Sequence, residues 1–414
     1  MPSYLSPGVY VEEVPSAIKA IAGVSTSTAG FIGIVPDKIH LVAEDEAPAT
    51  KFVDFSLPTL SKMPKLITNW TQFTQAFGGL VGDSAVAKTN DPNPMIDEGH
   101  QRLAHAVYGF FNNGGSRCFV VRIKDSTELD DALRAFSTID EIALVAAPGI
   151  TDDSSRDKIV SHCSQTADRF AVLDGPSSTD DLTKLTKTAA DAGLMPKKTD
   201  FAAWYFPWIQ VFDPATKLQK PNEDGALAVP PSGHLAGIYA RVDTQRGVHK
   251  TPANEAILGA LNVTQPLSKA DQDGLNPKGV NCIRSLNDNI VVWGGRTVGG
   301  DANADLKYIS VRRTLLFLRK SIGEGTQWVV FEPNTPAMWQ KITRNVSAFL
   351  TNVWRSGALF GTTPEQAFYV KCDAETNPPE LRELGQVVTE IGVAIVRPAE
   401  FVIFRISQAA AQGK

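Results

Sequence analysis

Hydrophobic and polar positions follow a different pattern in each part of the chain. Over residues 1–20, prolines exclude a helix, and the side chains of residues 9–12 alternate between apolar and polar as they do in a strand. We therefore expect an extended arm at the start. A strand rich in small and β-branched side chains is expected over residues 24–35, and loops around short elements over residues 36–95.

From about residue 98, helical and strand patterns alternate along the chain. Leu103, Val107 and Phe110 repeat at helical spacing. Short runs of β-branched apolar residues, typical of strands, follow at 117–123, 142–148 and 169–176. Because helical stretches separate these runs, the pattern predicts parallel βαβ units with a sheet buried on both faces.

The last third of the chain has an α+β pattern. Helices are expected at about 305–322 and 336–356, with strand segments on both sides and a final strand over about 400–408. Together the patterns divide the chain into five expected segments. These are an N-terminal arm (1–20), a strand and loop segment (21–95), an α/β domain (96–235), an α+β domain (236–399) and a terminal strand with a polar tail (400–414).

The composition indicates which kinds of binding partner the chain is not expected to have. The chain has 414 residues, of which 43% are hydrophobic and 21% charged, enough apolar material for the cores of more than one domain. Its formal net charge of -5 argues against a general nucleic-acid binder, which carries a basic excess, so we expect no nucleic-acid partner. No apolar run approaches the roughly 18 to 20 residues that span a bilayer, so direct membrane insertion is not expected.

The first residues lack the basic and apolar regions of a secretory signal peptide, so we expect the protein to be made in the cytoplasm. The four cysteines are scattered without metal-binding spacing. A disulfide framework is not expected in a chain this long with so few cysteines.

The histidines and serines do not form a recognisable active site. His100 and His105 are five residues apart on a predicted helix, roughly 140° around its axis, so they do not share a face as metal ligands do. They are interpreted as part of an ordinary helix surface. Ser232 stands two residues before His234 but follows two prolines in a predicted loop, whereas a nucleophile elbow needs a serine between a strand and a helix. We interpret Ser232 as a turn or N-cap residue.

The glycine-rich segment 294–301 (GGRTVGGD) superficially resembles a phosphate-binding loop. It lacks the Lys-Ser/Thr pair of such loops and is interpreted as a turn. Acidic pairs such as Asp152 and Asp153 are neighbours in sequence and do not face each other. We therefore expect no catalytic residues, no cofactor and no metal ligands. An α/β hydrolase-like or nucleotide-using enzyme with an unrecognised site stays open as the alternative.

The two ends of the chain resemble contractile tail-sheath proteins. SPGVYVEEVPS followed by STSTAGFIG, within residues 1–35, resembles the opening of these proteins. Residues 278–408 resemble their C-terminal domain. The segments that carry this resemblance are NCIR, VVWGGRTV, YISVRRTLLFLRKSI, QWVVFEPNTPAMWQKI, SAFLTNVWRSGALFGTTPEQAFYVKCD and RPAEFVIFRISQ, in that order. IYARVDTQRGVHKTPANE, residues 238–255, resembles the junction between the family's two halves.

The resemblance implies an α+β C-terminal sheath domain and an inserted α/β domain with a subtilisin-like topology that lacks catalytic residues. It implies a structural subunit that polymerises helically around an inner tube and contracts to drive the tube through a target envelope. The implied partners are further copies of the chain, the inner tube protein, and baseplate and tail terminator proteins. The family occurs in phage tails, pyocin-like particles and extracellular contractile injection systems. Such a particle would be made in the bacterial cytoplasm and could be released from the cell.

Both termini are predicted strands with no partner strand next to them in sequence. Pairing with the sheet edge of a neighbouring copy would satisfy their N–H and C=O groups. A head-to-tail contact of this kind that does not close builds a helix of subunits. The alternative is that both arms pair within their own subunit. The expected intersubunit residues are Val9, Tyr10, Val11, Glu12, Phe401, Val402, Ile403 and Phe404.

A basic stripe is predicted on the helix at about 305–322. Arg312 and Arg319 are seven residues apart, as are Arg313 and Lys320, so all four fall in one sector of a helix. Residues 306–355 contain eight Lys or Arg and two Glu, a local charge of +6 in a chain of net -5. The four residues are candidates for contact with the inner tube. The alternatives are a solvated helix face or pairing with carboxylates of adjacent subunits.

Overall fold

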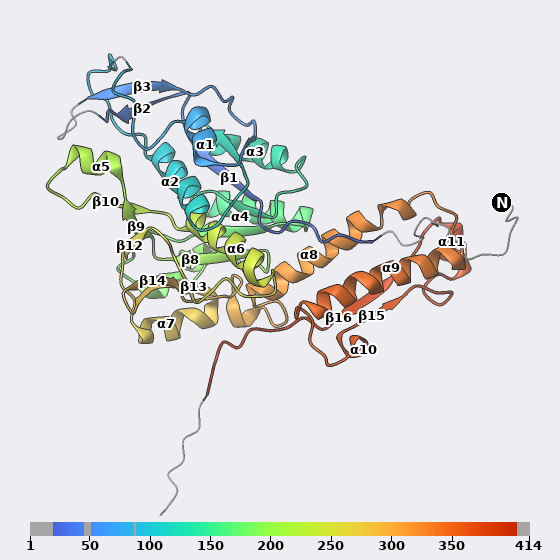
Figure 1. Cartoon of the computed structure of the whole chain (residues 1–414). Coiled ribbons are helices and arrows are strands. Elements are labelled where there is room, and N and C mark those ends of the chain that lie inside the picture. The colour runs from blue at the N-terminus through green and yellow to red at the C-terminus, as the bar shows by residue number, and fades with distance from the viewer. Residues whose placement is uncertain (1–19, 45–50, 87, 404–414) are drawn as a thin grey trace, which may run out of the picture. The chain divides into compact units, whose positions relative to one another are not determined.

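The structure, a computed structural model, describes residues 20–44, 51–86 and 88–403. These residues form two compact units (Figure 1). The sheet unit consists of residues 24–319 together with 395–403, and the hairpin unit consists of residues 20–23 together with 320–394. The chain therefore passes between the units three times. The expected segments do not coincide with these units, since the expected boundary at residue 235 lies inside a helix of the sheet unit.

A nine-stranded sheet forms the centre of the sheet unit (Figure 1), in the order β11-β14-β13-β8-β7-β6-β1-β5-β4. The strands from β13 to β5 in this order are parallel, and β4, β14 and β11 are antiparallel to their neighbours. The bounds are β1 (Ala29–Ile34), β4 (Lys65–Ile67), β5 (Cys118–Ile123), β6 (Leu144–Ala146), β7 (Phe170–Asp174), β8 (Ala202–Phe206), β11 (Glu255–Ala256), β13 (Val280–Leu286) and β14 (Asn289–Val292).

Helices cover both faces of this sheet, which explains why every side chain of β7 and β8 is buried. Helices α2 (Glu98–Asn112) and α6 (Ser232–Arg246) share one core with Phe31 of β1. Helices α3 (Leu129–Phe136) and α4 (Asp153–Thr166) share the other core with Ile32, the next residue of the same strand. The predicted parallel βαβ units are confirmed for β5, β6 and β7.

Helix α6 begins at Ser232, which was expected to lie in a loop. The residues before it also form regular elements, α5 (Pro214–Gln219) and β10 (Ala226–Val229). Gly233 lies so close to α2 that a Cβ atom there would collide with the backbone of Ala106. The two helices therefore pack almost backbone to backbone, and α6 is held as a buried helix in spite of the prolines before it.

Smaller elements complete the sheet unit. Strands β2 (Lys38–Val42) and β3 (Phe52–Ser56) form a hairpin, and β10, β9 (Ile209–Phe212) and β12 (Ala260–Val263) form a three-stranded sheet. The remaining helices are α1 (Trp70–Phe77), α7 (Lys269–Leu275) and the first part of α8 (Ile309–Gly325). Two short 3₁₀ segments, Leu182–Thr186 and Ala189–Asp191, lie between β7 and β8 in the chain.

The hairpin unit is built around helix α9 (Pro336–Arg355). Thr335 caps this helix and Pro336 occupies its first turn, where a missing N–H costs nothing. Its apolar face buries Met338, Ile342 and Phe349 among others. The other elements are the end of α8, α10 (Pro364–Ala367), β15 (Phe368–Lys371), α11 (Pro379–Glu383) and β16 (Glu390–Val393). The segment QWVVFEP, between α8 and α9, contains a 3₁₀ turn at Gln327–Val329.

Candidate assembly surfaces

The carboxyl ends of the parallel strands, where sheets of this kind bind ligands, are occupied here by the chain's own capping contacts. The Asp174 carboxylate at the end of β7 accepts hydrogen bonds from the Ser232 hydroxyl at 2.7 Å, the Ser232 N–H at 2.9 Å and the Gly149 N–H at 3.1 Å. Burial raises the pKa of Asp174 to about 6, against these hydrogen bonds. Ser232 is thus the first residue of α6, tied to β7, and its hydroxyl serves this cap.

The candidate histidines are core residues. His105 Nε2 lies 3.0 Å from the Asp213 carboxylate, and both side chains are buried. His100 and His234 are buried as well, which makes the expectation of an ordinary helix surface for His100 and His105 wrong. Among residues 20–44, 51–86 and 88–403, no group of three or more His, Cys, Asp or Glu side chains is arranged to hold a metal ion.

Mild acid should weaken the sheet unit because three buried histidines are held neutral. Burial lowers the pKa of His100 and His162 to about 4 and that of His234 to about 3. Above pH 6.5 the imidazoles are neutral in both folded and unfolded chains. As the pH falls below 6.5, the unfolded chain binds protons that the folded chain cannot, so the free energy of unfolding decreases.

Asp174 changes the free energy of unfolding in the opposite direction. Because its pKa is raised in the folded chain, the folded chain binds this proton at a higher pH than the unfolded chain does, which offsets part of the loss. At about 1.4 kcal/mol per pKa unit, we expect a net loss of about 3 to 4 kcal/mol between pH 6.5 and 5, measured by urea unfolding. The variant His234→Gln should flatten the slope. A free energy of unfolding that stays constant over this pH range would contradict the expectation.

Helix α8 carries the predicted basic residues, but they do not form one exposed stripe. Arg313 is buried and makes a two-pronged ion pair with Asp243 of α6, at 2.9 and 2.6 Å. Arg312 lies 3.1 Å from Asp200 and stacks over the ring of Phe201. The expectation that Arg312 and Arg313 project from a free basic face is therefore wrong, because both side chains are taken up by the sheet unit's own acidic and aromatic groups.

Two of the four predicted basic residues remain candidates for contact with another protein. Arg319 is exposed at the end of the sheet unit's part of α8, and Lys320 is half-buried at the start of the hairpin unit. On α9, Lys341 and Arg344 are exposed and three residues apart, so they lie on one face of that helix. Positive charge thus persists on exposed helix positions of both α8 and α9.

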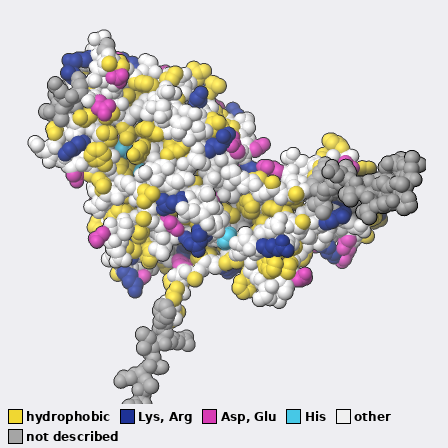
Figure 2. Space-filling model, in the orientation of Figure 1, with side chains coloured by type: hydrophobic (Ala, Val, Ile, Leu, Met, Phe, Trp, Pro, Cys, Tyr) yellow, Lys and Arg dark blue, Asp and Glu magenta, His cyan; other side chains and the backbone are white. Residues whose placement is uncertain are grey.

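The C-terminal segment of the described chain presents apolar side chains to solvent. Phe401, Val402 and Ile403 are 69%, 69% and 79% exposed and belong to no strand of the described chain. Figure 2 shows hydrophobic side chains along the segment that leads to the grey C-terminal trace. The other predicted arm residues, Val9, Tyr10, Val11, Glu12 and Phe404, lie outside the described residues. Exposed consecutive apolar residues of this kind are a candidate contact surface.

The hairpin unit offers open strand edges. Strands β15 and β16 form a two-stranded antiparallel ribbon, with Phe368 opposite Val393 and Lys371 opposite Glu390. Neither strand has a second neighbour among the described residues, so each presents one free row of N–H and C=O groups. An isolated two-stranded ribbon is marginally stable, and further strands would stabilise it.

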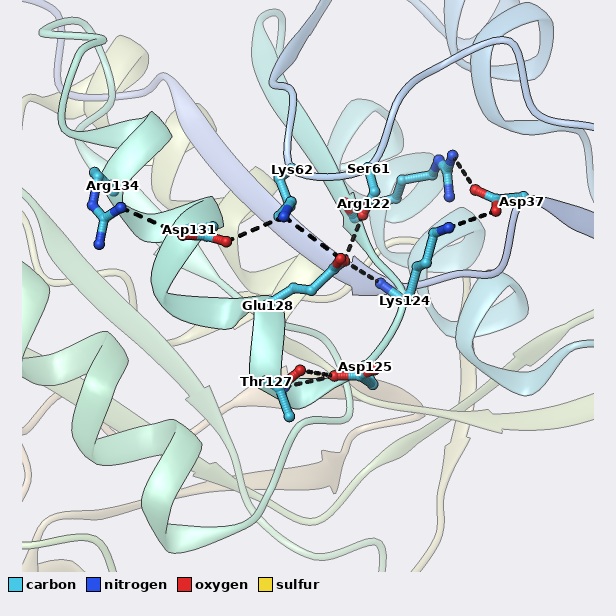
Figure 3. Close-up of polar contacts among 10 residues, drawn as sticks. All are labelled: Asp37, Ser61, Lys62, Arg122, Lys124, Asp125, Thr127, Glu128, Asp131 and Arg134. Atoms are coloured by element: carbon cyan, nitrogen blue, oxygen red, sulfur yellow. Dashed lines mark hydrogen bonds and ion pairs between the residues drawn. The ribbon is translucent and has the colours of Figure 1, made fainter.

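A charged network fastens a surface loop to the end of β5 (Figure 3). The Arg122 guanidinium contacts the Asp37 carboxylate at 2.7 Å and the Thr59 carbonyl at 2.8 Å. The Ser61 hydroxyl donates to Glu128 at 2.6 Å, which holds the pKa of Glu128 below its usual value. The loop also carries the exposed side chains of Leu60 and Met63. A fixed backbone with two exposed apolar side chains is a second candidate contact surface.

Comparison with known proteins places these surfaces in context. The family model described as "Phage tail sheath protein central domain" matches residues 125–298, and "Phage tail sheath C-terminal domain" matches residues 301–409. A prophage major tail sheath protein of Pseudomonas aeruginosa strain UCBPP-PA14 is 26% identical over 309 residues, covering 73% of this chain and 72% of that protein. The tail sheath protein of Burkholderia phage BcepMu is 25% identical, covering 71% of this chain and 59% of that protein.

Solved structures match over the whole length. The sheath of an extracellular contractile injection system, PVC, in its contracted state has a TM-score of 0.72 and 27% identity, with 100% of both chains covered. The helical sheath of the anti-feeding prophage in its contracted state has a TM-score of 0.71 and 27% identity, covering 97% of this chain and 99% of that chain. Both family domains and both structural matches agree on one kind of protein.

Proposed function

The chain belongs to the phage tail sheath family, and from this premise we propose that it polymerises helically around an inner tube and contracts to drive that tube through a target envelope. It is a structural sheath protein and not an enzyme, because its relatives and structural neighbours are sheath proteins. The full-length match to the contracted PVC sheath carries the proposal, since it covers 100% of both chains. Electron microscopy of the purified protein tests it. Tubes are expected, whereas an enzyme of this size would remain as separate particles.

The finer features of the fold are part of the proposal. We propose that the α/β part is a subtilisin-like insert without catalytic residues and that the termini are extended strand arms. The doubly wound sheet with β1 in its interior supports the first point. The use of Ser232 and Asp174 in a helix cap, where a catalytic group would be expected, supports it further.

We propose that the arms join neighbouring copies through β-sheet contacts. The free edges of β15 and β16 are suitable acceptors, because an added strand would satisfy their unpaired backbone groups. The exposed run Phe401–Ile403 suits such a role, since it has the apolar, β-prone composition of a strand but no partner in its own described chain. Contacts of this kind leave each unit free to move as a rigid body during contraction.

We propose that basic residues of α8 and α9 contact an inner tube with an acidic outer surface. The candidates on α8 are the exposed Arg319 and the half-buried Lys320, and the alternative on α9 is the exposed pair Lys341 and Arg344. Exposed ion pairs contribute only about 0 to 1 kcal/mol each, which suits a contact that must release when the sheath widens. Complementary charge would also set the register of subunits on the tube.

Reversing the charges on α8 tests this contact. The double variant Arg319→Glu with Lys320→Glu should fold normally but form fewer extended sheaths around the tube, and the remaining sheaths should dissociate at lower salt. The matched variant Lys341→Glu with Arg344→Glu changes the same charge on α9. If the α8 variant assembles with normal yield and salt tolerance while the α9 variant does not, the attachment surface lies on α9.

The proposed setting is a phage tail or a phage-tail-like particle made in the bacterial cytoplasm. Baseplate and tail terminator proteins are the further proposed partners, and nucleic acid is not. Within the described chain, none of the helices has both the length and the apolar character that a bilayer crossing needs.

A further inference from the structure

The glycine-rich segment 294–301 holds a carboxylate of the chain's own C-terminal segment. Arg296 grips Glu400 with two parallel hydrogen bonds, Nε to Oε1 and Nη2 to Oε2, each 2.8 Å long. Asn276 Nδ2 donates to Oε1 at 2.7 Å, and the Tyr308 hydroxyl donates to Oε2 at 3.1 Å. We name the three donors Asn276, Arg296 and Tyr308 the arm socket. All of them and Glu400 belong to the sheet unit.

The backbone of the arm socket is held by contacts that do not involve Glu400. Arg296 is buried, and its backbone is fixed on both sides by Asn281, which accepts from the Arg296 N–H and donates to the Arg296 carbonyl, both at 2.8 Å. Gly300 has φ +51, and a Cβ there would collide with the Pro277 carbonyl beside Asn276. The glycines therefore allow the segment to press against the Asn276 turn. The segment is an anion-binding loop whose anion is Glu400.

Glu400 stands at the point where the C-terminal segment leaves the subunit. The three residues after it, Phe401 to Ile403, are exposed, and no ion pair of the described residues lies beyond it. The preceding ion pair, Arg397 with Asp305 at 3.9 Å, joins two exposed side chains and contributes little. By contrast the Glu400 side chain is only 18% exposed and has three donors. The arm socket is thus the last firm attachment of the described chain.

We propose that the arm socket fixes the origin of the C-terminal arm, so that Glu400 is a positioning residue for assembly. The proposal rests on the proposed role of the C-terminal residues as a link to a neighbouring copy. With Glu400 held, the arm can start only from the sheet unit beside β13 and β14. Without it, residues 396–400 are freed as well, which adds about 17 Å of possible reach at about 3.3 Å per residue. The arm then leaves the subunit from many different positions, and most of these positions do not fit the geometry of the sheath.

Assembly of three variants tests the proposal. Glu400→Gln keeps the shape of the side chain but removes its charge, and it should lower the yield of sheath about tenfold at a fixed subunit concentration (about 1.4 kcal/mol). Asp301→Asn is the matched control, because Asp301 also contacts Arg296, at 3.0 Å, but is not part of the arm. It should assemble as the unchanged protein does. A deletion of residues 401–414 should prevent assembly.

The three outcomes separate the possible failures. If Glu400→Gln assembles normally while the deletion does not, the arm is a link but the arm socket does not position it. If both Glu400→Gln and Asp301→Asn lose assembly equally, the effect comes from Arg296 and its loop, and the proposal is overturned. If the deletion itself assembles normally, the proposed arm contact fails, and the positioning role fails with it.

A measurement on the soluble subunit keeps the test independent of assembly. The four native cysteines are buried, so Ile403→Cys provides one accessible thiol for a fluorescent label. Fluorescence anisotropy decay should show faster local motion of the label when Glu400→Gln is added, and no change when Asp301→Asn is added. Equal decay in all three proteins, with circular dichroism confirming that each is folded, would overturn the proposal.

Discussion

A subunit that lacks residues 1–15 should fold and remain soluble, and yet form no sheath. The deletion removes the alternating run of residues 9–12, which we propose to pair with a neighbouring copy, and leaves both described units intact. Loss of the link is expected to be nearly complete, because every subunit in a helical array would lose the same contact. Electron microscopy checks for tubes, and circular dichroism with analytical ultracentrifugation checks that the subunit is folded and monomeric.

A pair of matched variants separates strand pairing from mere loss of chain. Val9→Pro with Val11→Pro removes backbone N–H donors that a strand ladder needs, whereas Val9→Thr with Val11→Thr keeps them and keeps β-branched side chains. We expect the proline variant to fail like the deletion and the threonine variant to assemble. Normal tubes from the deletion or from the proline variant would show that the N-terminal arm is not the link.

Replacing Asp243 by Asn should lower the free energy of unfolding of the sheet unit by about 3 to 5 kcal/mol, the cost of leaving a buried charge without its partner. The side chains of Arg313 and Asp243 are only 3% and 4% exposed. The Thr26 hydroxyl also donates to Asp243 at 2.6 Å, and Arg313 lies 4.7 Å from the centre of the Tyr239 ring. The pair therefore joins α8, α6 and the segment before β1.

The exposed pair of Arg117 and Glu141 provides the control. It also has two hydrogen bonds, at 2.7 and 2.9 Å, but its side chains are 42% and 38% exposed. Glu141→Gln should therefore cost no more than about 1 kcal/mol. The apolar double variant Arg313→Met with Asp243→Leu should recover most of the stability that Asp243→Asn loses. Urea unfolding that gives equal losses for Asp243→Asn and Glu141→Gln would contradict the assignment.

Local patterns predicted the parallel strands better than they predicted the surfaces. The runs around β5, β6 and β7 are buried on both faces, so their continuous apolar character is visible in the sequence alone. The basic stripe of α8 was predicted from helical spacing, which says which side chains share a face but not what that face meets. Arg313 pairs with Asp243, which lies seventy residues earlier in the chain. A local pattern cannot predict a contact over that separation in sequence.

The glycine-rich segment 294–301 is a second case in which a local pattern could not predict a contact between residues far apart in sequence. Its composition indicated a turn and argued against a phosphate loop. In the structure the segment forms turns and a short 3₁₀ segment, Gly300–Ala302. The role of Arg296 depends on Glu400, more than a hundred residues later, so it could be found only once both were placed in space. Similarly, Ser232 was placed in a loop because two prolines precede it, whereas packing against α2 makes it helical.

The order of the chain also has a consequence for synthesis. In the hairpin unit Ile21 packs against Gly325, where a Cβ would lie 2.6 Å from the Ile21 side chain. About 300 residues separate these partners, and at about 5 to 20 residues per second a ribosome needs about 15 to 60 s to join them. During that time β1 to β8 can already pair, whereas β15 and β16 do not yet exist. A nascent chain therefore has no ribbon edge yet. If these edges accept the arms of neighbouring copies, as we propose, polymerisation must wait until translation is almost complete.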